Sequence, residues 1–85
     1  MRSFVYTVKN EVGLHARPAG MLVRLVGTLT SEVWIKKGEK KVEGTRLLAL
    51  MGLGVGRGDE ITVEIEGGDE VESEASLRRF LSENL

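Results

Sequence analysis

Glu60-Ile61-Thr62-Val63-Glu64-Ile65-Glu66-Gly67-Gly68-Asp69 contains the clearest alternation of apolar and polar residues in this chain of 85 residues. The three apolar residues would share one face of a β-strand, and the residues between them would face water. Gly67-Gly68 then predicts a turn. Asp69 can cap a final helix, with Glu72 three residues later completing a capping box. The stretch therefore predicts a half-buried strand that leads directly into a C-terminal helix.

Strand and helix spacing recur in the rest of the chain. Ala19, Leu22, Val23 and Val26 lie at i, i+3, i+4 and i+7, the buried stripe of a helix that Gly27 would end. The other predicted elements are a strand through Phe4, Tyr6 and Val8, a hairpin of Glu32–Lys36 and Lys40–Glu43, and a short helix over Leu47–Met51. The apolar side of the last helix would consist of Val71, Ala75, Leu77, Phe80, Leu81 and Leu85.

The predicted order of elements is βαββαβα. Four strands that are each half polar cannot bury both faces of a sheet, so three helices on one face would leave the other face to water. This predicts an α/β (α+β) fold, a two-layer open-faced sandwich with a four-stranded antiparallel sheet. No repeat, linker or low-complexity segment interrupts the chain, so residues 1–85 are expected to form one domain.

The composition narrows the classes of function. Hydrophobic residues make up 41% of the chain and charged residues 29%, as in ordinary soluble globular proteins. No apolar run approaches the ~20 residues that span a bilayer, and the N-terminus lacks the apolar core of a signal peptide. We therefore expect a cytoplasmic protein that does not insert into membranes. The absence of cysteine excludes disulfides and thiolate metal sites.

The charges are divided unevenly along the chain. Residues 1–58 contain ten basic and four acidic side chains, a balance of +6, and residues 59–85 contain two basic and nine acidic ones, a balance of −7. The basic part suits an anionic ligand or an acidic partner, although solvated faces would explain the division equally well. Nucleic acid is disfavoured as a partner because the whole chain is not basic and its few aromatic residues form no stacking motif.

The stretch Gly13-Leu14-His15-Ala16-Arg17-Pro18-Ala19 contains the only histidine and the only proline of the chain. If Leu14 or His15 precedes the first helical residue, Pro18 lies in the first turn, where proline is tolerated. The free N–H groups of such a helix start bind phosphate. Arg17 adds a guanidinium that can contact phosphate oxygens, and a neutral imidazole is a good nucleophile. These residues together predict a site that accepts a phosphoryl group.

Other interpretations of His15 remain open on spacing alone. An ordinary loop histidine without a function is nearly as well supported as a phosphoryl acceptor. A general base assisted by Glu11 is also compatible with the sequence. A metal site is disfavoured because one histidine without cysteine offers too few soft ligands. A small hydrolase is disfavoured because no motif sets a serine beside His15. We therefore expect neither a metal nor a cofactor.

A glycine-rich segment, Gly52-Leu53-Gly54-Val55-Gly56-Arg57-Gly58, resembles a nucleotide-binding loop only superficially. The G-x-G-x-x-G pattern needs a glycine three residues after its second glycine, and none of the three possible frames has one. No G-K-[ST] sequence is present either. The glycines are expected to shape the connection between the short helix and the last strand.

The Gly13–Ala19 stretch, the length, the element order and the spacing of Gly54, Gly58 and Ile61 resemble HPr, the histidine-containing phosphocarrier protein of the bacterial phosphoenolpyruvate:sugar phosphotransferase system. The resemblance implies that Nδ1 of His15 takes a phosphoryl group from phosphorylated Enzyme I and passes it to EIIA domains of sugar permeases. It implies a phosphohistidine intermediate in a protein that is not a stand-alone enzyme. Arg17 and the N–H groups of Ala16 and Arg17 would steady the phosphate.

The same resemblance implies a docking surface on the first and second helices. Its residues would be Gly20, Met21, Arg24, Leu47, Leu48 and Met51. Five adjacent apolar residues on so short a second helix cannot all be buried, so some are expected to face a partner. A monomer is expected because no apolar surface is evident beyond this docking patch.

Two positions depart from the pattern of the family. Many members have a serine at the start of the second helix that a kinase phosphorylates, and Arg46 stands there in this chain. Arginine cannot accept that phosphate, so no regulatory serine is expected, and Thr45 could cap the helix instead. Val12 stands where many members have a small polar residue beside the histidine.

An alternative function remains open. The chain could be a regulatory protein with the HPr fold that acts in a nitrogen-branch or metabolic-control pathway.

Overall fold

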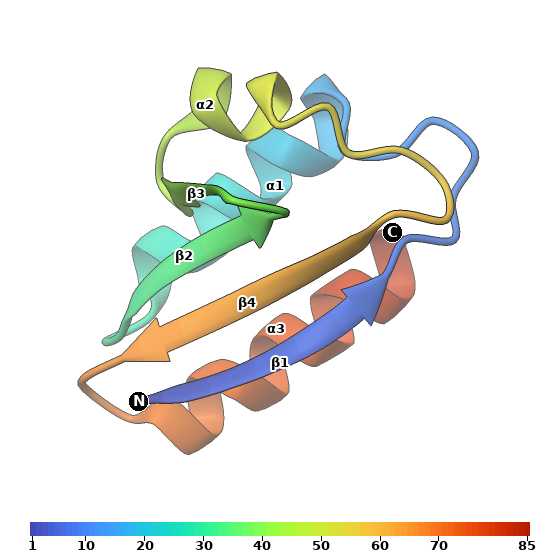
Figure 1. Cartoon of the computed structure of the whole chain (residues 1–85). Coiled ribbons are helices and arrows are strands. Elements are labelled where there is room, and N and C mark those ends of the chain that lie inside the picture. Colours follow the sequence, from blue (N-terminus) through green and yellow to red (C-terminus); the bar gives the residue numbers. More distant parts are fainter.

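The computed structural model describes all 85 residues and has the predicted order of elements. These are β1 (Arg2–Thr7), α1 (Ala16–Thr28), β2 (Glu32–Lys37), β3 (Lys40–Glu43), α2 (Leu47–Gly52), β4 (Glu60–Glu66) and α3 (Glu70–Asn84). The strands form one sheet in the order β1-β4-β2-β3, with every neighbouring pair antiparallel. Helices α1 and α3 lie on the same side of the sheet, and α2 lies beside α1 and β3 (Figure 1). The open-faced sandwich is therefore confirmed.

The core lies between the sheet and the helices. Strand register aligns Phe4, Val63 and Ile35 in one row across the sheet, and all three side chains are buried. Leu22 of α1 and Leu77 of α3 complete one cluster of 18 buried apolar residues, so both layers share a single core. None of the three helices combines the length and the apolar character that crossing a membrane requires.

The buried side of α3 differs from the sequence prediction. Leu77 is buried as expected, but Val71 is 65% exposed and Ala75 is also exposed. Ser73 is buried instead, where its hydroxyl lies 2.8 Å from the hydroxyl of Ser31. At about 3.6 residues per turn, the position four before Leu77 faces the sheet, whereas the position two before Ser73 points away from it. Hydrogen bonding between the two serines allows a polar residue to fill this core position.

The predicted helix ends are only partly correct. The Asp69 carboxylate accepts from the N–H of Glu72 at 3.1 Å, but the N–H of Asp69 donates to the Thr30 hydroxyl rather than to Glu72, so half of the capping box forms. Helix α1 ends at Thr28, one residue beyond the predicted stop. Arg46 occupies the N-cap position of α2 and makes no side-chain cap bond, so Thr45 is not the cap that the sequence suggested.

The glycine-rich connection between α2 and β4 is held by Asp59. The Asp59 carboxylate accepts from the N–H of Gly56 at 2.8 Å and lies 3.0 Å from Nζ of Lys37. The N–H of Gly56 foremost, and then the Lys37 ammonium, hold the pKa of the Asp59 carboxyl below its ordinary value. The segment is thus a fixed connection, as its glycines predicted, and it borders the loop that carries His15.

Candidate functional site

His15 is the N-cap residue of α1. Its backbone is extended (φ −89°, ψ −173°), and its carbonyl oxygen accepts the first hydrogen bond of the helix from the N–H of Ala19 at 3.0 Å. The imidazole makes no cap bond and no other hydrogen bond with the protein, and the residue is exposed. Both ring nitrogens are therefore available to a reacting group from outside.

The first turn of α1 presents two unpaired backbone donors next to this imidazole. The N–H groups of Ala16 and Arg17 precede the first intrahelical donor, and Pro18 has no N–H. The N–H of His15 itself donates to the carbonyl oxygen of Gly13 at 3.0 Å. No acidic residue lies in the first turn, so the positive end of the helix dipole is not neutralised within the helix. The arrangement fits an anion at the position the sequence predicted.

The loop before His15 is fixed by close contact with the glycine-rich connection. The N–H of Leu14 donates to the carbonyl oxygen of Val55 at 3.1 Å, and the Leu14 side chain is buried. Gly13 has a φ of +81°, and a Cβ at this position would overlap the Val55 oxygen. Only glycine combines this backbone conformation with so close an approach. Gly13 therefore determines where the chain turns into α1.

A hollow next to the imidazole is lined by His15, Arg17, Pro18, Met21 and Asn84. The guanidinium of Arg17 forms no ion pair within the protein and is exposed, so it can reach a ligand held at His15. Asn84 ends α3, far from His15 in sequence, and nothing in the sequence pattern indicated that it would border the site. Val12, in the loop before Gly13, is 67% exposed and offers no hydrogen bond to the ring.

The residues of the predicted docking surface lie on α1 and α2, which contact each other. They are Gly20, Met21 and Arg24 on α1 and Leu47, Leu48 and Met51 on α2. Leu48 is 82% exposed and Leu47 and Met51 are each 39% exposed, whereas Leu50 is fully buried. Helix α2 is thus anchored by Leu50 and presents three apolar side chains to the solvent beside α1. Arg46, at the start of α2, is also exposed.

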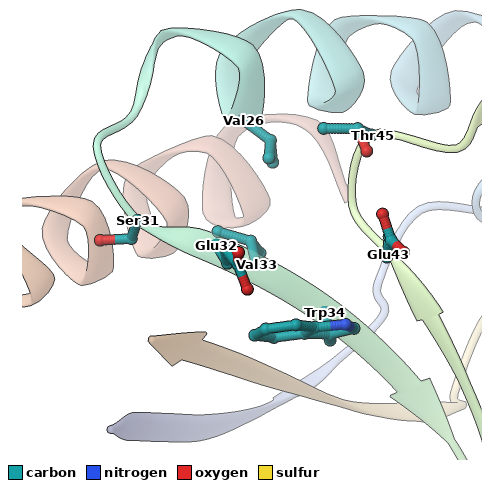
Figure 2. Close-up of a pocket in the computed structure, with 7 residues that line it drawn as sticks. All are labelled: Val26, Ser31, Glu32, Val33, Trp34, Glu43 and Thr45. Atoms are coloured by element: carbon teal, nitrogen blue, oxygen red, sulfur yellow. The ribbon is translucent and has the colours of Figure 1, made fainter. Parts of the chain in front are cut away.

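A second hollow lies at the opposite end of α1 from His15 and is not suited to phosphate. Figure 2 shows it between the last turn of α1, the first half of β2 and the end of β3, with Trp34 on one side. Its charged side chains are Glu32 and Glu43, and it contains no basic group. Carboxylates would repel an anionic ligand, so this hollow takes no part in the chemistry predicted for His15.

Comparison with known families agrees with the geometry at His15. The family model described as "PTS HPr component phosphorylation site" matches residues 2–83 of the chain. The chain belongs to the HPr family. The exposed N-cap residue His15 and the first turn of α1 lie in Gly13–Ala19, the stretch on which the resemblance to this family was based.

Individual HPr-family relatives extend the comparison. HPr-like protein Crh of Halalkalibacterium halodurans is 42% identical over 74 residues, which cover 87% of this chain and 88% of the relative. The structure of HPr-C-His from Thermoanaerobacter tengcongensis has a TM-score of 0.90 at 34% identity and covers 96% and 92% of the two chains. Crh of Bacillus subtilis, whose structure is described as a domain-swapped catabolite repression protein dimer, has a TM-score of 0.77 at 35% identity, over 94% and 92%.

Proposed function

We propose that this protein is a phosphocarrier that accepts a phosphoryl group on Nδ1 of His15 from phosphorylated Enzyme I and passes it to EIIA domains of sugar permeases. The observation that carries the proposal is the exposed imidazole at the start of α1, next to two unpaired backbone N–H groups and the unpaired guanidinium of Arg17. The protein would act in the cytoplasm, where these partners would meet it, as a monomer.

The transfer needs an in-line approach and stabilisation of the phosphoryl oxygens more than it needs covalent chemistry by the protein. The lone pair of the imidazole nitrogen forms a bond to phosphorus while the bond between phosphorus and Enzyme I breaks. The N–H groups of Ala16 and Arg17, the helix dipole and the Arg17 guanidinium stabilise the negative oxygens. Transfer to EIIA is the same displacement in reverse, with a nucleophile of EIIA attacking the phosphorus.

Docking of either partner would use the exposed apolar side chains of α2 and the neighbouring face of α1. Leu47, Leu48 and Met51 expose apolar side chains on α2, and Arg24 on the contacting helix α1 is exposed and makes no ion pair. A surface that combines these apolar side chains with the basic residues Arg24 and Arg46 on the same two helices suits an acidic partner. Arg46 keeps a positive charge at this surface permanently, so docking would not be regulated through phosphorylation of this position.

The proposal is tested by following the phosphoryl group from one carrier to the next. The phosphorylated protein is isolated from Enzyme I and phosphoenolpyruvate and then mixed with an EIIA domain. We expect the protein to lose phosphate and EIIA to gain it in equal amounts. The Arg17→Ala variant should transfer more slowly while its free energy of unfolding stays within about 0.5 kcal/mol of wild type, because Arg17 is exposed. Loss of phosphate to water alone would contradict a carrier function.

A second candidate is suggested by the relatives named Crh, one of which is described as a catabolite repression protein. A purely regulatory protein would bind a transcription factor or metabolic enzyme through the same α1–α2 surface without using His15. The unobstructed His15 site argues against this alternative. Binding of such a regulator with equal affinity by wild type and His15→Ala, together with no phosphorylation by Enzyme I, would favour it. Sedimentation would show at the same time whether the protein dimerises as Crh of Bacillus subtilis does.

A further inference from the structure

Asn10 joins the loop before His15 to the C-terminal end of α3. Its side-chain nitrogen Nδ2 donates to the carbonyl oxygens of Gly13 at 3.3 Å and Asn84 at 3.0 Å, and its Oδ1 accepts from the N–H of Gly13. The backbone N–H of Asn10 donates to the backbone oxygen of Leu85 at 2.9 Å. In Figure 1 the loop after β1 passes next to the end of α3. One half-buried side chain thus connects the two segments that border the hollow at His15.

The Gly13 residue is held on both sides by these bonds. Its N–H is bonded to Oδ1 of Asn10, and its carbonyl oxygen accepts from both Nδ2 of Asn10 and the N–H of His15. Gly13 has a positive φ, where glycine has more backbone freedom than any other residue. Contacts from outside the residue must therefore fix its orientation, and Asn10 supplies two of them.

We infer that Asn10 is a positioning residue for phosphoryl transfer. By fixing Gly13, Asn10 sets the direction in which the chain enters α1, and with it the imidazole of His15 and the free N–H groups behind it. Asn10 makes no hydrogen bond to the imidazole and is not part of the α1–α2 docking surface. Its effect is therefore on the geometry of attack and not on the binding of Enzyme I. This inference rests on the proposed function.

Two substitutions separate the bonds of Asn10. Asn10→Ala removes all three side-chain hydrogen bonds. Asn10→Asp keeps an acceptor for the N–H of Gly13 but directs a second oxygen at the carbonyl oxygens of Gly13 and Asn84. A matched control is Ser31→Ala, because Ser31 follows the end of α1 that is farther from His15. This substitution removes the hydrogen bonds of the Ser31 hydroxyl to the carbonyl oxygen of Gly67 (2.6 Å) and to the hydroxyl of Ser73. The control loses buried hydrogen bonds without changing the loop at His15.

The experiment measures kcat and KM of Enzyme I with each variant as the phosphoryl acceptor, at a temperature where circular dichroism shows all of them folded. We expect Asn10→Ala to lower kcat by about tenfold or more, because misplacement of a reacting group is costly, and to leave KM unchanged. Asn10→Asp should also lower kcat, and Ser31→Ala should match wild type in both constants. If Asn10→Ala does not fold, Asn10→Asp decides the question alone.

Three results would overturn the inference. An unchanged kcat in the folded Asn10 variants would show that the loop does not need Asn10. An equal fall in kcat with Ser31→Ala would assign the effect to general stability. A wild-type protein that takes no phosphoryl group would overturn the proposed function as well, so the wild-type rate distinguishes the failure of the inference from the failure of the function.

Discussion

Replacement of Gly13 by alanine tests the physical basis of the His15 site. A Cβ at Gly13 would overlap the carbonyl oxygen of Val55 and lie 2.8 Å from Cα of Gly56. The positive φ of +81° costs a residue with a Cβ roughly 1–2 kcal/mol. Relief of the overlap would break the Leu14 N–H···Val55 bond and leave buried groups unpaired, which costs about 1–3 kcal/mol more. The free energy of unfolding should therefore fall by about 2–5 kcal/mol.

Gly27→Ala is the matched control for this substitution. Gly27 lies in α1, has no atom within 4 Å of an added Cβ and has no positive φ. Alanine should stabilise the helix there by roughly 0.5–1 kcal/mol, so the two substitutions are expected to have opposite signs. Urea unfolding with a linear extrapolation measures both. A Gly13→Ala variant as stable as Gly27→Ala would refute the argument that close backbone approach fixes the loop before His15.

Two further predictions concern α2 and the carboxylates. Leu50→Ala should lower the free energy of unfolding by about 2–5 kcal/mol because Leu50 is fully buried. Leu48→Ala should change it by less than about 0.5 kcal/mol but raise the KM of Enzyme I; the opposite ranking in urea would contradict the assignment of the α2 faces. The pKa values of Asp59 and Glu74 are lowered, by the Gly56 N–H and the Arg2 guanidinium respectively. Both carboxylates bind protons at lower pH in the folded chain than in the unfolded chain, so their contribution to the free energy of unfolding is present above pH about 4 and is lost as the pH falls further. A urea midpoint that does not fall in acid would contradict this.

The sequence was sufficient for elements whose hydrophobic period is unambiguous. Strand β4 has the predicted bounds because its alternation is complete, and strand β3 of the hairpin has them because Gly38 and Gly44 stand on either side of it. The sequence left either Leu14 or His15 as the residue before α1, with Pro18 in the first turn, and the structure makes His15 the N-cap. The fold class therefore depended on short-range rules, whereas the preference for His15 as a phosphoryl acceptor over an ordinary loop histidine depended on the resemblance to HPr.

The parts that could not be predicted depend on long-range hydrogen bonds. Ser73 faces the core because Ser31, far away in sequence, supplies a partner for its hydroxyl, and no apolar period indicates this. The half-formed capping box has the same origin, since Thr30 competes for the N–H of Asp69. Asn10 likewise approaches the end of α3 only in the folded chain. Positioning residues of this kind require the tertiary structure.

The central claim is that the His15 imidazole at the start of α1 accepts a phosphoryl group. Its most direct test is intact mass spectrometry of the protein after incubation with Enzyme I and phosphoenolpyruvate. We expect the mass to increase by one phosphoryl group, the increase to disappear after brief acid treatment as expected for a phosphohistidine, and His15→Ala to show no increase. No increase in wild type, while the same Enzyme I phosphorylates an HPr of known activity, would contradict the account, as would an increase that persists in His15→Ala.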